Sequence, residues 1–455
     1  MPYEGEFAQY RSLRRIAESE KVKQLLGEYK IRDTTGEAAF PDTISVDELP
    51  SSDWKPDWVL AVDGSHHEVP VRNGFPGAEA SYLTVASVLL DVDKIRRLDS
   101  NRPVDPKVFR TTEQADSIDW AFPGCNVISA GESSAKDSLR KSLLEVLINQ
   151  QMSADGETLL DTYEALLAYK PTGGQDQKCP YEDCPVNDGA YRRGSGKYVC
   201  GCQDARTLYS TDALRIYEGM NPAGTNGKMF AEIMQVLERV WVVHILRTFE
   251  KKRWLPLLQK IAVVVDGPLA IFGHPAWLSQ AIVKELSRLN AVAKSATNGQ
   301  DILMIGIEKT GEFVEHFRQI DLDENGGAGK FQSRRVALLT DSYIKRNIIF
   351  SESPKPYGRD TYFGRKFLYK TQSGAQIVAM LPFLEEKHSD ISTAEISQFP
   401  RLSDAVGLLD SLVSSRYPNA LSPLVAANAE AAIPLNLGKK VLEKLAKELI
   451  SENRR

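Results

Sequence analysis

The stretch "VVVDGPLAIFG" at Val263–Gly273 decides the fold class, together with "VLAVDGS" at Val59–Ser65. In both, an apolar strand runs into an Asp-Gly pair. A carboxylate at the end of a buried strand lies at the rim of the sheet, where ligand sites of α/β folds form, and glycine allows close backbone approach there. We therefore expect Asp63 and Asp266 at a sheet rim, where aspartates from neighbouring strands can share a divalent cation. The alternative for either motif alone is a simple turn.

Further apolar runs alternate with amphipathic segments through most of the chain. This alternation favours a mixed α/β sheet flanked by helices over a sandwich or a helical bundle. The other predicted strands are 80–93, 125–130, 260–266, 301–307, 335–340, 366–371 and 376–381. The predicted helices are 133–151, 155–169, 226–251, 275–290, 309–319, 401–414, 422–433 and 438–452.

Composition places the protein among globular chains. It has 455 residues, of which 42% are hydrophobic and 26% charged, and its net charge is −5. That charge argues against a protein that coats nucleic acid through bulk electrostatics, although it allows a local basic groove. The longest apolar run, "VWVVHIL", is too short to span a bilayer. Because the N-terminus shows no secretory signal, we expect a cytoplasmic protein with no membrane partner.

The chain divides by pattern into a body with additions. Residues 5–28 have a roughly helical apolar period, and the acidic, proline-punctuated stretch that follows has none. The predicted parts are an N-terminal amphipathic helix with an acidic linker (1–55), a first part of the body (56–170), a cysteine-rich insertion (171–225), a second part of the body (226–435) and a C-terminal helix (436–455).

A third carboxylate is expected from the predicted helix 226–251. Metal-dependent nucleases use two cations about 4 Å apart, and a helix facing the sheet commonly supplies a further acid. The helix offers Glu232, Glu238 and Glu250. Glu238 stands among valines, a leucine and a tryptophan, where an acid needs a specific reason. An ordinary ion pair with Arg239 or Arg247 is the alternative.

A basic and aromatic segment spans 334–370. It carries nine Lys or Arg residues against three acids, with seven Tyr or Phe residues interleaved. Basic groups for phosphates and aromatic faces for unstacked bases are what a channel for single strands or strand ends needs. A solvated basic face above core aromatics is the alternative. The first candidates for DNA contact are Tyr343, Lys345, Arg346, Arg365 and Lys366.

Four cysteines lie close together in the irregular insertion. Cys179, Cys184, Cys200 and Cys202 give the spacing C-x4-C-x15-C-x-C. Two close thiolate pairs can close a tetrahedral zinc site, and an insertion with little apolar content needs such a crosslink. The sequence therefore predicts a zinc-ribbon-like insertion with structural Zn²⁺, and free thiols are the alternative.

The chain resembles the NurA nuclease family from about residue 56 to 435, outside the insertion. The resemblance rests on "VDGS" at Val62–Ser65, "VDGPL" at Val265–Leu269, the glutamate-bearing helix between them, and "RYPNALSPLVAANAEAAI" at 416–433. It implies an RNase H-like fold and a DNA nuclease that hydrolyses phosphodiester bonds.

The resemblance also implies the ligand set. In that family two aspartates and a helical glutamate hold two catalytic Mn²⁺ or Mg²⁺ ions, which implies Asp63, Asp266 and Glu238 here. The family's shorter gap before the second aspartate makes Glu250 a competitor. Where the family has a fourth ligand, a histidine, this chain has Asn428, which offers a carbonyl oxygen but no acid or base. Asp341 is the alternative source of charge.

Partners follow from the same resemblance. It implies a homodimer that docks on a hexameric HerA-like ATPase, which feeds duplex DNA to the nuclease in DNA-end processing or antiviral defence. The N-terminal helix is then a candidate docking element, with packing on its own domain as the alternative. An alternative function is that of a catalytically weak adaptor that binds the motor and DNA without cutting. Asn428 in place of the histidine favours this alternative, and the presence of Asp63 and Asp266 argues against it.

Overall fold

The computed structural model divides the chain into two units, Met1–Phe40 and Pro41–Arg455. The residues described are 10–29, 40–74, 77–92, 94, 113–153, 156–171, 179–185, 196–202, 204–297, 299–323, 327, 329–413, 421–432, 441–442 and 444–445. The first unit contains α1 (Tyr10–Glu18) and α2 (Glu20–Glu28). The prediction of one continuous helix over 5–28 is wrong within these residues, because Ser19 leaves the helix and caps α2 through Val22 N.

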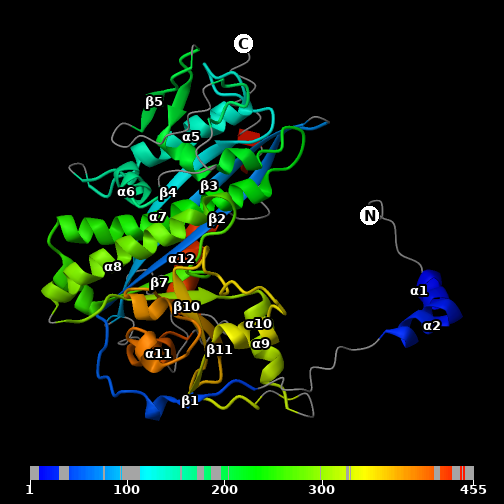
Figure 1. Ribbon diagram of the computed structural model, residues 1–455, viewed down its shortest axis with the longest axis vertical. Coiled ribbons are helices and arrows are strands. Elements are labelled where there is room, and N and C mark those ends of the chain that lie inside the picture. The colour runs from blue at the N-terminus through cyan, green and yellow to red at the C-terminus, as the bar shows by residue number, and fades with distance from the viewer. Residues whose placement is uncertain are drawn as a thin grey trace. The chain divides into compact units, whose positions relative to one another are not determined.

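The second unit is built on a nine-stranded mixed sheet with the order β1-β9-β10-β11-β8-β7-β2-β3-β4 (Figure 1). Only β2–β7 and β7–β8 pair in parallel, and the remaining neighbours are antiparallel. The strands are β1 (Ile44–Ser45), β2 (Trp58–Arg72), β3 (Ala78–Asp91), β4 (Glu113–Pro123), β7 (Ile261–Asp266), β8 (Leu303–Glu308), β9 (Arg335–Leu338), β10 (Gly364–Lys370) and β11 (Gln376–Pro382).

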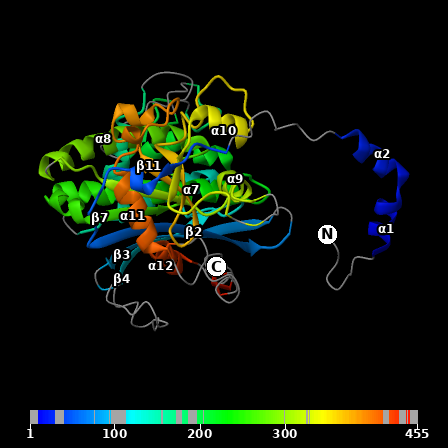
Figure 2. The ribbon, with the colours of Figure 1, turned by 90° about the horizontal axis from the view of Figure 1, so that it is seen from below.

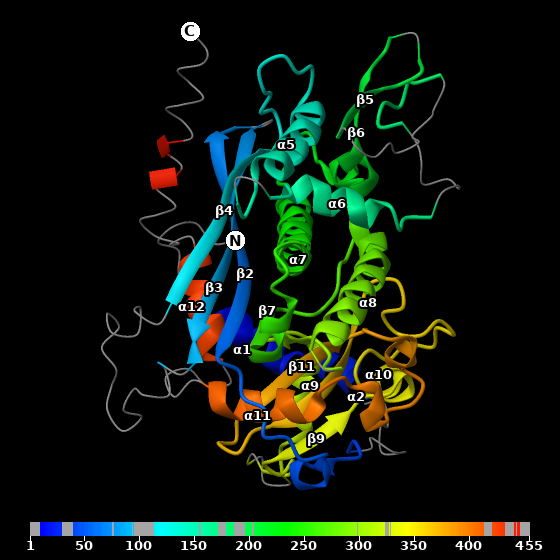
Figure 3. The same ribbon diagram turned by 90° about the vertical axis from the view of Figure 1, so that its left-hand side faces the viewer.

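Helices cover both faces of this sheet, as predicted. In Figure 3, α7 lies on one side of β2 and β3, and α12 lies on the other. Leu60, Val62 and Val263 face the core under α5–α8, whereas Val59 and Ala61 face the core under α11 and α12. The helices are α5 (Ala135–Asn149), α6 (Leu159–Leu167), α7 (Gly227–Lys251), α8 (Leu278–Ala296), α9 (Glu312–Ile320), α10 (Asp341–Asn347), α11 (Leu402–Leu412) and α12 (Ser422–Ala431). None of the helices in the described ranges is both long enough and apolar enough to cross a membrane.

The strand predicted at 125–130 is wrong, because those residues form turns and irregular backbone after β4. The actual strand, β4, is at the edge of the sheet and is largely exposed, with Ile118 and Phe122 among its few buried side chains. The stretch predicted as linker also contributes β1, whose Ile44 pairs with Val336. Of the predicted C-terminal helix, only 441–442 and 444–445 are described, and they are helical.

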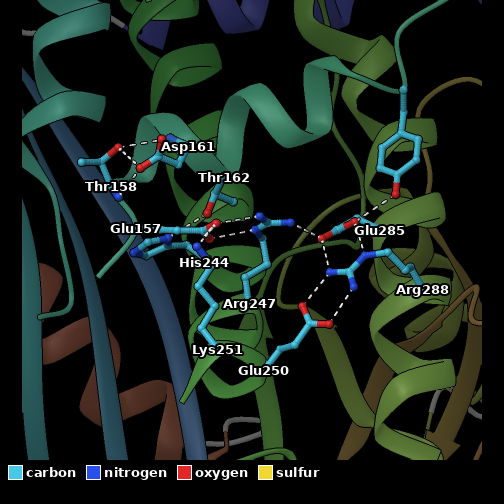
Figure 4. Close-up of polar contacts among 11 residues, drawn as sticks. Glu157, Thr158, Asp161, Thr162, His244, Arg247, Glu250, Lys251, Glu285 and Arg288 are labelled. Atoms are coloured by element: carbon cyan, nitrogen blue, oxygen red, sulfur yellow. Dashed lines mark hydrogen bonds and ion pairs between the residues drawn. The ribbon is translucent and has the colours of Figure 1, made fainter. Parts of the chain in front are cut away.

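A polar network ties α6, α7 and α8 together (Figure 4). Arg247 of α7 binds Glu157, just before α6, and Glu285 of α8, with Nη1 2.5 Å from Glu285 Oε1. Arg288 of α8 bridges Glu285 and Glu250, the latter at 2.7 Å. These charges are paired on several sides, which fixes the long helix that carries Glu238 relative to its neighbours.

The described part of the cysteine-rich segment is anchored on α5 by a buried arginine. Arg140 is 1% exposed, binds Asp212 through Nε and Nη2, both at 2.7 Å, and lies over the ring of Tyr181. The segment forms a small sheet of β5 (Lys197–Val199) and β6 (Thr207–Tyr209). After β6, four side chains pack into the main core under α5–α8: Ala213, Leu214, Ile216 and Tyr217.

Candidate active site

The two Asp-Gly motifs meet in the centre of the sheet. Val62 of β2 pairs in parallel with Val265 of β7, so that Asp63 and Asp266 are the next residues in register. Asp266 ends β7, and Gly267 follows with a φ of 73°, in the left-handed region that favours glycine. The expectation of a strand end at Asp63 is wrong, because β3 continues to pair with β2 as far as Arg72. Asp63 instead lies one residue beyond the stretch of β2 that pairs with β7.

Glu238 of α7 reaches the same place. It is 4% exposed and lines one cavity with Asp63 and Asp266. Gly64 makes this approach possible, since a Cβ there would lie 3.0 Å from Met234 Cγ and 3.6 Å from Glu238 Oε2. The glycine of the first motif therefore allows close helix packing, while that of the second allows a positive φ directly after β7.

Burial raises the pKa values of two of these carboxyl groups, Asp63 and Glu238. The pKa of Asp63 is raised to about 8, mainly by burial and next by the Asp266 carboxylate, against the opposing effect of Lys309. The pKa of Glu238 is raised to about 7, because burial outweighs the lowering effect of Arg239. Asp63 Oδ2 is buried and has no hydrogen-bond partner in the described structure. A site of this kind favours a bound cation.

Two basic side chains partly balance the cluster. Arg239 Nη1 lies 2.8 Å from Glu238 Oε1, and its Nη2 donates to the carbonyl oxygens of Asp266 and Pro268. Lys309, directly after β8, places Nζ 3.0 Å from Asp266 Oδ2. Arg239 thus fixes the turn after β7, whereas Lys309 is a partly exposed counter-ion on the cavity side.

The cavity around these groups has a volume of about 570 Å³. Lys366 of β10, Tyr357 and Tyr362 also line it. Lys366 Nζ lies 2.5 Å from Glu308 Oε1 and 3.5 Å from the centre of the Phe313 ring. The cavity lining therefore combines the three carboxylates with a lysine that is paired with Glu308 and held among aromatic rings.

The alternative glutamates lie elsewhere on α7. Glu232 Oε2 lies 3.0 Å from His274 Nδ1, from which it can accept a hydrogen bond, and its side chain packs against Gly273. Glu250 binds Arg288 in the network of Figure 4, twelve residues along the helix from Glu238. A separation of twelve residues corresponds to about 18 Å along an α-helix. Of the three candidates, Glu238 is the one that the structure brings to the aspartates.

Neither proposed fourth ligand lines the carboxylate cavity as described. Asn428 is exposed on α12, which packs on the same sheet face as Ala61, two residues before Asp63. Asp341 accepts a hydrogen bond from Tyr357 N and pairs with Lys345 at 2.8 Å. Ligation by Asn428 remains a prediction.

The five DNA-contact candidates fall into two groups. Tyr343, Lys345 and Arg346 lie on α10, where Tyr343 Oη is 2.8 Å from His316 Nε2. Arg365 and Lys366 are adjacent on β10 and are only 3% and 5% exposed. Because of this burial, these two can contact only a group that enters a cavity, not a strand lying on the open surface.

The cysteines cluster as predicted. The Sγ atoms of Cys179, Cys184 and Cys200 all lie within 4.8 Å of one another, and those of Cys184 and Cys200 are 3.5 Å apart. Cys202 is buried in the same cluster. Zn–S bonds of about 2.3 Å in a tetrahedron give sulfur separations near this spacing. The group could hold a metal ion.

Sequence reasoning missed Lys309 and Glu308 as members of the site. The signal was present, since "LMIGIEK" is a third apolar strand that ends in charged residues. β8 runs parallel to β7, so its carboxyl end reaches the same rim. The parallel trio β2, β7 and β8 therefore supplies charged groups from three neighbouring strands.

Fold and site together define a mixed α/β protein with an acidic, metal-type site at the rim of its parallel strands. The NurA domain matches residues 58–433, and the chain belongs to the NurA family. This membership supports a nuclease role. No curated protein matches the chain. Among solved structures, it is similar to the crystal structure of the NurA nuclease from Sulfolobus solfataricus, at 9% identity over 98% of each chain, with a TM-score of 0.39.

Proposed function

We propose that the protein is a metal-dependent DNA nuclease that hydrolyses phosphodiester bonds with Mn²⁺ or Mg²⁺ at Asp63, Glu238 and Asp266. The observation that carries this proposal is the convergence of these carboxylates in one cavity, with Asp63 Oδ2 buried and without a partner in the described structure. Family membership supports it independently.

The residues fit a hard divalent cation. Carboxylate oxygens are its preferred ligands, and a positive charge beside Asp63 and Glu238 would offset the burial that raises their pKa values. When two such ions are bound, they supply activation of a water molecule and stabilisation of the leaving oxygen. Asn428, with its neutral carbonyl oxygen, is the proposed fourth ligand.

The chain's own side chains do the remaining work. Arg239 holds the turn after Asp266 through two carbonyl oxygens and so fixes the position of that carboxylate. Lys309, 36% exposed and on the cavity side, is placed to meet a substrate phosphate once Asp266 binds a cation. Lys366, Tyr357 and Tyr362 line the same cavity and offer a lysine and aromatic faces to a bound strand.

The remaining parts of the proposal concern assembly. We propose that the protein works as a homodimer with a hexameric HerA-like DNA translocase, in DNA-end processing or antiviral defence. The net charge of −5 supports a division of labour in which the motor grips DNA and the nuclease offers a local basic passage. We propose structural Zn²⁺ at the cysteine cluster, since the Sγ atoms of Cys179, Cys184 and Cys200 lie within 4.8 Å of one another, close enough to bind one ion.

The test is cleavage of linear DNA in Mn²⁺ by the wild-type chain, Asp63→Asn and Glu238→Gln, each with and without the motor and ATP. Asp57→Asn is the control for the first variant, because Asp57 forms an exposed pair with Lys260 just before β2. Glu250→Gln is the control for the second, on the same helix.

Cleavage by the wild type and both controls, with loss of at least a hundredfold in the two site variants, supports the proposal. If the folded wild-type protein cuts no DNA, even with the motor, the nuclease proposal is wrong and the protein is better explained as an adaptor.

A further inference from the structure

A second cavity adjoins the carboxylate cavity and is lined by basic side chains. Its volume is about 410 Å³, within the range of small-ligand pockets. Arg359, Arg365 and Lys366 line it, and no Asp or Glu is among its described lining residues. Lys366 is paired with Glu308, whereas Arg359 and Arg365 form no ion pair among the residues described, so two of the three cationic side chains line this cavity without a paired acid.

Arg365 is the centre of this argument. It is 3% exposed, and its guanidinium donates to two neutral acceptors, Asp390 O at 2.9 Å and Thr393 O at 2.6 Å. Within the described structure it forms no ion pair, and its Nε is buried without any partner. This buried charge is offset by the two carbonyls, by the ring of Phe399 and by the nearby carboxylate of the exposed Asp390, and an anion in the cavity would stabilise it further.

This cavity shares part of its lining with the carboxylate cavity. Tyr357, Tyr362 and Lys366 line both cavities. The two tyrosine hydroxyls are 2.7 Å apart, so the pair forms a shared partition that presents aromatic and hydroxyl groups to each side. A strand held at the carboxylates would place its neighbouring nucleotide against this partition. Arg359, on the cavity's edge, is exposed and has no ion pair among the residues described.

We propose that this cavity binds the phosphorylated terminal nucleotide of the DNA strand held in the active site, with Arg365 and Arg359 on the terminal phosphate. This inference rests on the proposed nuclease function and adds strand-end recognition to it. The guanidinium groups suit a phosphomonoester dianion, which they can bind through two parallel hydrogen bonds.

The test is binding of a fluorescent eight-nucleotide dT strand to full-length Asp63→Asn protein in chelator, measured by anisotropy. Three versions of the strand carry a 5′-phosphate, a 3′-phosphate or no phosphate. We expect a phosphate at one end to tighten binding at least tenfold. Arg365→Met and Arg359→Gln should each reduce this preference at least threefold, and Lys355→Gln, an exposed control outside the cavity, should leave it unchanged.

Arg365 also holds the loop at 390–393, so Arg365→Met could misfold. The side chain of Arg359 supports no such loop in the described structure, so Arg359→Gln keeps the test valid in that case. Equal affinity for all three strands would overturn the proposal. So would competition by free dTMP without any preference for phosphorylated strands, because the cavity would then serve a free nucleotide. DNA cleavage by the wild type is measured separately, so its absence would overturn the proposed function without deciding the end preference.

Discussion

At the scale of single residues, Asp63 carries the conflict between stability and function. Its folded pKa of about 8 lies above the usual value of 3.8. Between these values the folded protein retains a proton that the unfolded chain has released. The carboxyl group therefore destabilises the fold increasingly as pH rises from about 4 to about 8.

Asp63→Asn should consequently be more stable than the wild type in chelator at pH 8, by about 1–3 kcal/mol, with a smaller difference at pH 5. Urea unfolding at the two pH values measures this directly. A variant that is less stable than the wild type at pH 8 would show that the carboxylate is satisfied without a metal.

Lys309 competes with a cation for Asp266. The pair is partly exposed, so its contribution is of the order of 1 kcal/mol. Lys309→Met should therefore bind Mn²⁺ about fivefold more tightly in calorimetric titration. Lys309→Arg retains the charge and should keep the wild-type affinity. Weaker binding by Lys309→Met would mean that the ammonium group supports the metal site.

At the scale of elements, the contact between α6 and α7 contains a buried neutral histidine. His244 is fully buried, with Nδ1 2.8 Å from Thr162 Oγ1, and burial lowers its pKa to about 4 (Figure 4). The unfolded chain takes up this proton near pH 6.5, and the folded protein does so only near pH 4. The stability that the neutral ring contributes is therefore present above pH 6.5 and is lost as pH falls toward 4.

Between pH 7 and pH 4.5 the free energy of unfolding should fall for the wild type. For His244→Gln this fall should be smaller by about 1–3 kcal/mol. His274→Gln is the control, since His274 is partly exposed. Unfolding curves at both pH values provide the measurement. Parallel losses in His244→Gln and the wild type would show that His244 is not the group responsible.

Elements were predictable where burial leaves a strong pattern. The strands β7 and β8 are apolar on both faces, and the sequence predicted both of them. The strand β4 was missed because an edge strand with exposed, charged residues carries no apolar period. The continuation of β2 through Gly64 to Arg72 was missed for another reason: its hydrogen bonds come from β3, and no local pattern near the glycine reports them.

The residues of the candidate site also fall into those that the sequence could predict and those that it could not. Asp63, Asp266 and Glu238 were predictable because an acid that interrupts an apolar run is visible in one dimension. The roles of Lys309 and Arg365 depend on which strands become neighbours, so spacing along the chain could not reveal them. Arg365 was predicted as a candidate phosphate contact, but its burial beside Phe399 was not predicted.

At the scale of the whole molecule, Figure 2 shows α7 and α12 on opposite sides of the β2–β3 ribbon. The carboxylate site lies in the central parallel strands of this sheet, while the cysteine cluster lies in a segment fixed to α5 through Arg140. The two metal-type sites therefore stand on different elements, and we expect them to be independent.

Purified protein should contain one zinc ion per chain by elemental analysis, and Cys184→Ser with Cys200→Ser should remove it and lower the melting temperature. Asp63→Asn should retain the zinc. A wild-type chain prepared without chelator that contains no zinc would contradict a structural metal at these cysteines.

The most direct test of the central claim is calorimetric titration of Mn²⁺ into the wild-type chain, Asp63→Asn and the control Asp57→Asn. If β2, β7 and α7 form one metal site, the wild type and Asp57→Asn will bind Mn²⁺ with the same affinity, and Asp63→Asn will lose at least tenfold. Equal binding by all three proteins would show that the Asp-Gly motifs do not hold the metal.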